Sequence, residues 1–145
     1  MKNTLKIFNH PPESGVKRLL TECRLEESDV TPAHLAHFFG LGSADKLEGV
    51  VGLEMCGPAA LLRSLAVSAF RRGQGWGSAL LMHAEEYAKA HRIESVYLLT
   101  QTAAPFFLRH GYLHADRDHA PDLIRQTKEF SELCPVSAIF LVKQV

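Results

Sequence analysis

The chain has 145 residues, of which 46% are hydrophobic and 22% charged, the balance of an ordinary globular domain. Its 16 Lys and Arg residues equal its 16 Asp and Glu residues, so the formal net charge is zero. A neutral chain has no overall field that would attract nucleic acid or an anionic membrane, and any anion site must be built locally. We therefore expect one domain over residues 1–145, with neither nucleic acid nor a membrane as partner.

Cysteine and histidine usage narrows the class of protein further. Cys23, Cys56 and Cys134 are an odd number at wide spacing, which is not the pattern of a disulfide framework or a zinc site. The eight histidines are scattered, with neither HExxH nor HxH spacing, so no metal site is expected. The start of the chain lacks the apolar core of a signal peptide, and no apolar run approaches membrane-spanning length. A cytoplasmic location is the expectation.

The first half of the chain predicts helices followed by hairpins. A short apolar segment at 5–8 could be an edge strand, and apolar side chains at helical spacing predict a helix at 15–25. Thr31 has the position of a helix N-cap, with Pro32 in the first turn. Glycines and short connections then favour antiparallel hairpins built from strands at 37–41, 47–55 and 60–67.

The second half changes to alternating helices and strands. Helical periodicity covers 75–92, and residues 95–100 read as a strand buried on both faces because their apolar run shows no alternation. Proline starts and a C-capping Gly111 predict helices from Pro105 and from Pro121 to about Leu133, before a last strand at 137–142. A strand, a helix and a further strand form a βαβ unit, so we expect an α/β fold with a mixed central sheet and helices on both faces.

The segment at 65–78 carries the clearest chemical signal. A strand ends, a basic glycine-rich loop follows, and a helix begins, so unpaired backbone N–H groups and the positive end of a helix dipole would face one point. Such a helix start can hold a phosphate or pyrophosphate. The spacing of Gly73, Gly75 and Gly77 is not GxGxxG, and the loop does not end in Gly-Lys-Ser/Thr, which excludes the dinucleotide fingerprint and the Walker loop. A tight strand-to-helix turn without a ligand is the competing interpretation.

Two stretches resemble the GNAT superfamily of N-acetyltransferases. Residues 72–77, Arg-Gly-Gln-Gly-Trp-Gly, are similar to its Arg/Gln-x-x-Gly-x-Gly/Ala signature. Residues 103–112, Ala-Ala-Pro-Phe-Phe-Leu-Arg-His-Gly-Tyr, resemble its second landmark, Ala-x-x-Phe-Tyr-x-x-x-Gly-Phe. The resemblance implies a mixed sheet splayed at the middle, with acetyl-CoA as cosubstrate in the gap and no metal. The residues that it assigns to acetyl-CoA are Leu65, Ala66, Val67, Arg72, Gly73, Gln74, Gly75, Trp76, Gly77, Ser78 and Phe106.

A narrower resemblance, at residues 50–54, 62–67, 98–107 and 130–138, is to the arsenic-resistance branch of these enzymes. It implies acetyl transfer to the amine of a small molecule, including an arsenic-containing or other toxic anionic compound. Acetylation of a protein or peptide amine is one alternative, and a non-catalytic acyl-CoA sensor is another. The chain is expected to be a monomer or a homodimer.

The residues that would do the chemistry depart from the pattern of the family. The tyrosine that commonly protonates the leaving thiolate is replaced by Phe107, which we expect to line the acceptor pocket instead. The strand glutamate of the histone-modifying branch is replaced by Leu61. Glu54 and Arg63 lie on adjacent predicted strands and are the candidates for catalysis and acceptor binding, unless they form a structural ion pair. Cys134 is a further candidate for contact with the acceptor, or else a small buried cysteine.

Overall fold

A computed structural model of the chain describes residues 6–133 and 137–145. Its contacts divide it into two compact units, which are described separately. The first unit comprises the chain through Glu54 together with residues 63–86, and the second comprises residues 55–62 and 87–145. Among the described residues, every helix is too short or too polar to cross a membrane.

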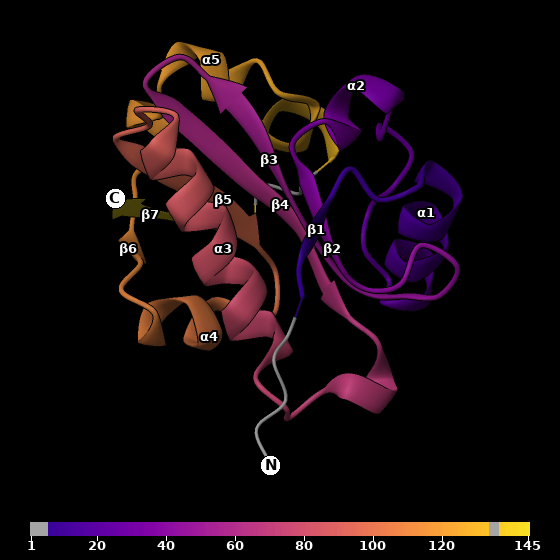
Figure 1. The fold of residues 1–145 in the computed structure, drawn as a ribbon. Coiled ribbons are helices and arrows are strands. Elements are labelled where there is room, and N and C mark those ends of the chain that lie inside the picture. Colours follow the sequence, from indigo (N-terminus) through magenta and orange to yellow (C-terminus); the bar gives the residue numbers. More distant parts are fainter. Residues whose placement is uncertain (1–5, 134–136) are drawn as a thin grey trace. The chain divides into compact units, whose positions relative to one another are not determined.

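The first unit contains the two N-terminal helices and the hairpin strands (Figure 1). Strands β3 and β4 and helix α3 begin in one unit and continue into the other. The elements that lie wholly or partly in the first unit are β1 (Phe8–Asn9), α1 (Glu13–Glu22), α2 (Pro32–Leu35), β2 (Phe38–Gly42), β3 (Leu47–Cys56), β4 (Ala59–Val67), the 3-10 turn η1 (Ala69–Arg71) and α3 (Trp76–Ala90).

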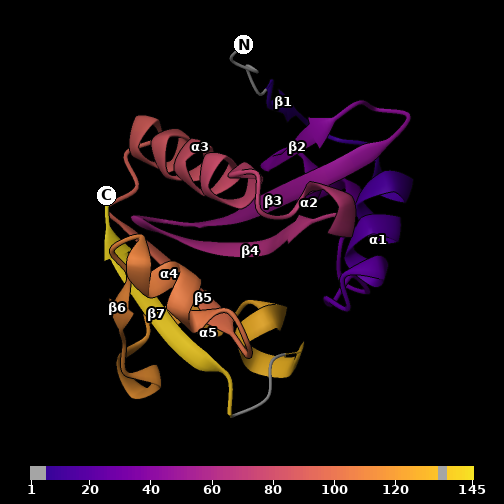
Figure 2. The same ribbon diagram turned by 90° about the horizontal axis from the view of Figure 1, so that it is seen from below.

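The second unit contains the C-terminal strands and several short helical segments (Figure 2). β7 has β5 along one edge and β6 along the other, with antiparallel pairing on both sides. The elements of this unit, besides the ends of β3 and α3 and the start of β4, are β5 (Ser95–Thr100), α4 (Ala104–Arg109), β6 (Leu113–His114), η2 (Arg117–His119), α5 (Asp122–Arg125), the π-helical η3 (Glu129–Leu133) and β7 (Ile139–Gln144).

Strand pairing confirms the predicted connections. In the first unit the order is β1-β2-β3-β4, and β2 pairs with both β1 and β3 in antiparallel fashion. In the second unit the order is β4-β5-β7-β6, and β4 pairs in parallel with β5 through Ala59–Leu61. The described residues thus form seven strands, mostly antiparallel and flanked by helices, which confirms the mixed α/β class.

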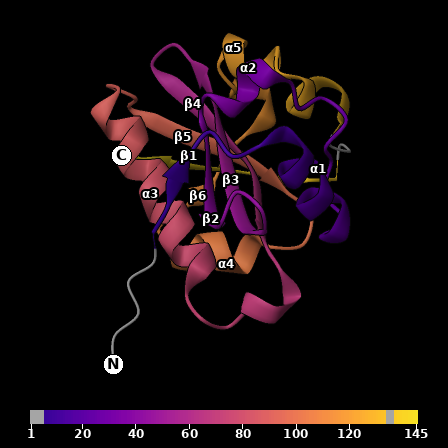
Figure 3. The same ribbon diagram turned by 45° about the vertical axis from the view of Figure 1, so that its right-hand side comes forward.

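Successive residues of β2 show that helices cover both faces of the first unit's strands. Phe38 is fully buried in a cluster with Val16 and Leu19 of α1. The next residue, Phe39, points the other way, and its ring centroid lies 4.8 Å from that of His83 in α3. Figure 3 shows α1 and the first part of α3 on opposite sides of β2 and β3. Because successive side chains of a strand point to opposite faces, β2 contributes side chains to two hydrophobic cores.

Two predictions for the second unit are wrong. The helix expected from Pro121 to Leu133 is broken into α5 and a π-helical segment. The cause is Thr127, whose buried hydroxyl donates to the carbonyl of Ile124 at 2.7 Å and so competes with regular helix bonding. β5 is not buried on both faces either, because Val96 and Leu98 are buried while the alternate residues Ser95, Tyr97 and Leu99 are half-buried.

Replacing Gly52 or Gly15 with alanine should change the stability of the protein in opposite directions. A Cβ on Gly52 would lie 2.2 Å from the ring of Phe38, its partner across β2 and β3, whereas a Cβ on Gly15 would meet Leu47 at an ordinary 3.6 Å. Gly52→Ala should lower the free energy of unfolding by about 1–3 kcal/mol through overpacking. Gly15→Ala, within α1, should raise it by up to about 1 kcal/mol. Urea unfolding of both variants checks this, and equal effects would contradict the described packing.

Candidate active site

The glycine-rich loop lies between the end of β4 and the start of α3, within the first unit. Gly73 and Gly75 have φ angles of +78° and +83°, which favour glycine. A Cβ at either position would meet no described atom of the chain within 4 Å. These two glycines are therefore required by backbone conformation, and the space beside them is open to a ligand.

The segment before the loop contains an unpartnered hydroxyl. Among the described residues, Ser68 Oγ is a buried side-chain atom that has no hydrogen-bond partner. The backbone N–H of Ser68 is engaged, since it donates to the carbonyl of Glu48 at 2.8 Å. A buried hydroxyl without a partner is costly, so a ligand that accepts a hydrogen bond there would be favoured. Together with the open space at the glycines, this fits a phosphate-bearing ligand.

Arg71 and Arg72 fix the loop to the strands. Arg71 Nε and Nη2 both lie 3.1 Å from Glu48 Oε1, and the guanidinium lies over the ring of Trp76 at 5.3 Å. Arg72 Nε donates to the carbonyl of Val67 at 3.1 Å. Both guanidinium groups therefore hold the shape of the loop while adding positive charge beside it.

Glu54 and Arg63, predicted to face each other across the hairpin, are in contact. Arg63 Nη1 donates to Glu54 Oε2 at 3.0 Å, and the Arg63 side chain is only 1% exposed. A third member is Asp29, which comes just before α2 and was not predicted from the sequence. Asp29 Oδ1 accepts from Arg63 Nη2 at 2.7 Å, and its Oδ2 accepts from Nη1 at 2.5 Å. Arg63 Nε also donates to Ser64 Oγ at 3.0 Å, so the guanidinium is engaged on each of its nitrogens.

His34 of α2 completes this group of residues, which we call the Arg63 cluster: Asp29, His34, Glu54 and Arg63. His34 Nε2 lies 3.8 Å from Glu54 Oε1, and His34 Nδ1 accepts the backbone N–H of Thr31 at 3.1 Å. The side chains of His34 and Glu54 are 26% and 15% exposed, against 4% for Asp29. Glu54 and His34 are thus the members of the cluster that a ligand can reach.

Charge within the cluster determines the pKa of Asp29. Burial alone would raise the pKa of this carboxyl, but the hydrogen bonds and charge of Arg63 outweigh burial, and the net pKa is below its usual value. Asp29 is therefore ionised at neutral pH. The formal charges of Asp29, Glu54 and Arg63 then sum to one negative charge.

The same cluster offers metal-ligand atoms. Single atoms of Asp29, His34 and Glu54 lie within 4.8 Å of one another. However, the guanidinium of Arg63 already contacts both carboxylates at hydrogen-bonding distance. A cation bound there would meet the positive charge of Arg63, so this geometry gives no support for a metal site.

The predicted residues of α4 belong to the second unit. Phe106 is half-buried and packs its ring against Phe107 and His110, with centroids 5.1 Å and 4.5 Å away. Phe107 is 6% exposed and meets Tyr112 edge-on at 5.7 Å. Tyr112 is 1% exposed and packs in the core. Cys134 lies outside the described residues.

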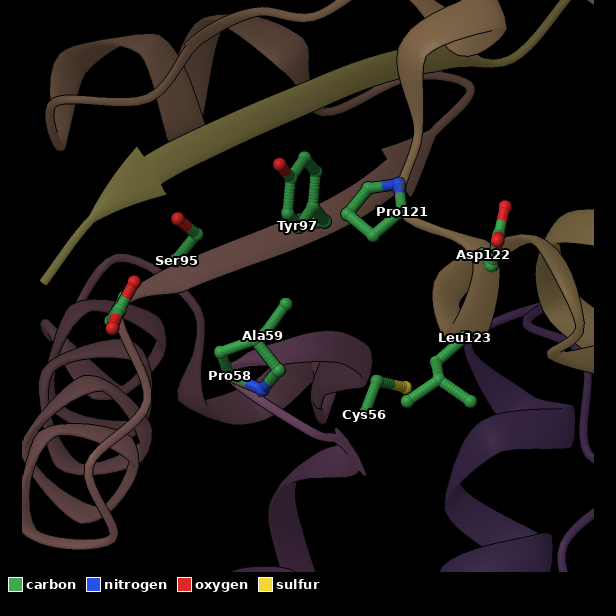
Figure 4. Close-up of a pocket in the computed structure, with 9 residues that line it drawn as sticks. Cys56, Pro58, Ala59, Ser95, Tyr97, Pro121, Asp122 and Leu123 are labelled. Carbon is green, nitrogen blue, oxygen red and sulfur yellow. The ribbon is translucent and has the colours of Figure 1, made fainter.

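A cavity of about 270 Å³ also lies within the second unit (Figure 4). Its walls include Cys56, Ala59, Tyr97, Pro121 and Leu123. Of the residues predicted for acetyl-CoA or the acceptor, those that the structure describes do not line this cavity. We therefore do not assign it to the predicted reaction.

Comparison with known proteins identifies the family. The model of the acetyltransferase (GNAT) family matches residues 3–112 of the chain. The chain belongs to the GNAT acetyltransferase family. Solved structures of similar fold include N-acetylglutamate synthase from Neisseria gonorrhoeae, in complex with coenzyme A and N-acetyl-glutamate, with a TM-score of 0.81 and 19% identity over 99% of this chain. This chain spans only 36% of that synthase.

Two further neighbours match over nearly their whole length. A Mycobacterium tuberculosis protein in complex with CoA has a TM-score of 0.76 and 16% identity, with 97% of this chain and 99% of that one covered. A GNAT-family acetyltransferase from Staphylococcus aureus has a TM-score of 0.74 and 15% identity, covering 97% and 99%. At these identities the likeness establishes the fold, and the roles of individual residues have to be argued from the site.

Asp29→Asn tests the charge balance of the cluster. The substitution removes one of the two negative charges that pair with the buried guanidinium of Arg63. The free energy of unfolding should therefore fall by about 3–5 kcal/mol at neutral pH. Because the pKa of Asp29 is lower in the folded than in the unfolded protein, its contribution is fully present above about pH 4–5 and is lost as the pH falls through the folded value. Urea unfolding between pH 3 and 7 should thus show a flatter acid limb in Asp29→Asn than in the parent, while exposed Asp45→Asn should follow the parent.

Proposed function

We propose that this GNAT protein transfers the acetyl group of acetyl-CoA to the amine of a small molecule, with Glu54 as the group that accepts the amine proton. The observation that carries the proposal is that one strand, β4, leads directly from the Arg63 cluster to the glycine-rich loop. Membership of the acetyltransferase family supports the reaction type. The CoA-bound neighbours support the choice of cosubstrate for a chain of this fold.

Residues of the first unit would hold the cosubstrate. The backbone of Arg72–Ser78 would bind the pyrophosphate, since Gly73 and Gly75 leave open space there. The main chain of Leu65 and Val67 would pair with the pantetheine arm as an added strand does. The carbonyl of Val67 already accepts from Arg72, so we expect the remaining bonding of this edge to come from Leu65 and neighbouring amides. Phe106, in the second unit, remains a predicted contact.

The transfer itself balances without a metal or a redox partner. The neutral amine attacks the thioester carbonyl carbon, a C–N bond forms, the C–S bond breaks, and coenzyme A leaves as a thiolate. The amine proton passes to Glu54, directly or through water. Phe107 cannot protonate the thiolate, so that proton is supplied from solvent, and the low basicity of a thiolate makes its departure feasible.

The engaged state of Arg63 bears on the choice of acceptor. With Asp29 and Glu54 on its guanidinium and a side chain 1% exposed, Arg63 is poorly placed to bind an acceptor carboxylate. We therefore propose that Glu54 is the acceptor contact and that Arg63 holds it in place. Under this proposal an amine without an anionic group suits the cluster better than the anionic acceptor expected from the sequence. An arsenic-containing acceptor and its contact with Cys134 remain predictions.

A non-catalytic acyl-CoA sensor is the second candidate. Two observations favour it: Leu61 and Phe107 stand where relatives carry a glutamate and a tyrosine. Release of thiol from acetyl-CoA in the presence of a panel of primary amines separates the two functions. Tight binding of acetyl-CoA with no amine-dependent release would support the sensor.

Gly75→Val tests the cosubstrate site. A β-branched residue at φ +83° is strained and fills the space beside the loop, so acetyl-CoA affinity measured by calorimetry should fall at least about tenfold. Gly57→Val is the matched control, because Gly57 also has a positive φ, of +68°, but lies in the turn between β3 and β4. Gly57→Val should lower the melting temperature and leave the affinity near that of the parent. Unchanged affinity in Gly75→Val would refute the loop assignment.

Glu54→Gln tests the proton acceptor. Glutamine keeps an oxygen for Arg63 Nη1 but cannot take a proton, so kcat/KM for the amine should fall by about 10²-fold or more. Acetyl-CoA affinity should stay unchanged, since Glu54 is not assigned to the loop. Glu22→Gln, an exposed residue paired with Arg18 in α1, controls for the loss of a carboxylate. Full activity in Glu54→Gln would exclude Glu54 as the base.

A further inference from the structure

We infer that His34 is a positioning residue for Glu54: in its neutral form with the proton on Nε2, it directs an N–H at Glu54 Oε1. The inference rests on the proposed function, in which Glu54 accepts the proton of the acceptor amine. It concerns residues that the family signatures do not include, since α2 precedes both landmarks in the chain.

The tautomer of His34 follows from its hydrogen bond to Thr31. The backbone N–H of Thr31 points to His34 Nδ1 at 3.1 Å, and an amide N–H can only donate. We therefore assign His34 Nδ1 as the bare nitrogen, which can also accept from the Thr31 hydroxyl at 3.2 Å, and this places the proton of the neutral ring on Nε2. A proton added to Nδ1 would face the Thr31 N–H donor to donor and would break this cap of α2.

The two oxygens of Glu54 consequently face two different donors. Oε2 accepts from Arg63 Nη1 at 3.0 Å, and Oε1 faces His34 Nε2 at 3.8 Å. The second separation exceeds a hydrogen bond and can be closed by a small rotation of the carboxylate or by one bridging water. An oxygen of Asp29 also lies within 4.8 Å of a ring nitrogen of His34, and Arg63 contacts both carboxylates. Among the described residues, the charged groups near His34 are therefore Glu54, Asp29 and Arg63. Their net charge is negative, so an N–H directed toward them is favoured.

In this geometry His34 cannot accept a proton from Glu54. Because its Nε2 already carries a proton and Nδ1 is used by the cap, His34 has no bare nitrogen directed at Glu54. The amine proton would thus pass from Glu54 to solvent, which reaches the 15% of this side chain that is exposed. His34 orients the carboxylate, and a neutral donor does so without neutralising the charge that the base needs.

Two substitutions separate the roles of the two ring nitrogens. In His34→Asn the short amide can still accept from Thr31, as Asn commonly does near a helix start, but nothing replaces Nε2. In His34→Gln the longer amide can direct an N–H₂ at Glu54 and preserve the capping pattern. We expect His34→Asn to lower kcat about tenfold with KM for the amine and the melting temperature near the parent, and His34→Gln to recover most of kcat.

Three outcomes are distinguishable with the amine assay, using His119→Asn, an 84% exposed histidine, as the control. Loss of kcat in His34→Asn with recovery in His34→Gln supports the inference. Parent-like kcat in His34→Asn, while Glu54→Gln is inactive, overturns the inference and leaves the proposed function standing. Equal loss in both His34 variants together with a lower melting temperature also overturns it, since the role would then be the stability of α2. Full activity of Glu54→Gln, by contrast, would refute the proposed base itself.

Discussion

The burial of one guanidinium constrains most of what surrounds it. An arginine side chain that is 1% exposed has lost its water, and the loss is tolerable only where its N–H groups and charge are matched. Arg63 meets this requirement with Asp29, Glu54 and Ser64. These partners come from the loop before α2, from β3 and from β4 itself. The requirement of a single residue therefore joins the loop before α2 to the hairpin of β3 and β4, with 34 positions between Asp29 and Arg63.

This arrangement bears on the base that we propose for this GNAT chain. The position at which the histone-modifying branch carries a glutamate is Leu61 here, whereas β3 holds a carboxylate in contact with Arg63 of β4. Once Asp29 takes both terminal nitrogens of Arg63, Glu54 is the outer and more exposed of the two acids. The strand keeps Glu54 in the same unit as the glycine-rich loop.

Much of the fold could be predicted because its signals are local. Apolar spacing, a proline at a helix start and the turn at Gly57-Pro58 each specify structure within a few residues. The hairpins, the βαβ unit and the helices before Pro121 could be predicted from such signals. Asp29 could not be found in this way. It is one of several polar residues at 26–29, and only the tertiary position of Arg63 decides which of them is buried. The one available signal was indirect: a predicted buried arginine needs a partner, and Glu54 alone leaves several of its donors unmatched.

A local irregularity in β4 connects the cluster to the loop. Ser64 has φ +60°, a left-handed conformation that costs a non-glycine residue about 1–3 kcal/mol and that simple alternation could not predict. Around this residue the burial changes, since Arg63 and Ala66 are buried whereas Ser64, Leu65 and Val67 are half-buried. The hydrogen bond from Arg63 Nε to Ser64 Oγ helps to hold this conformation. The conformation of Ser64 decides which backbone groups of β4 are accessible after Arg63. The interactions that bury Arg63 therefore also affect how the backbone of Leu65–Val67 faces the acetyl-CoA that we propose it binds.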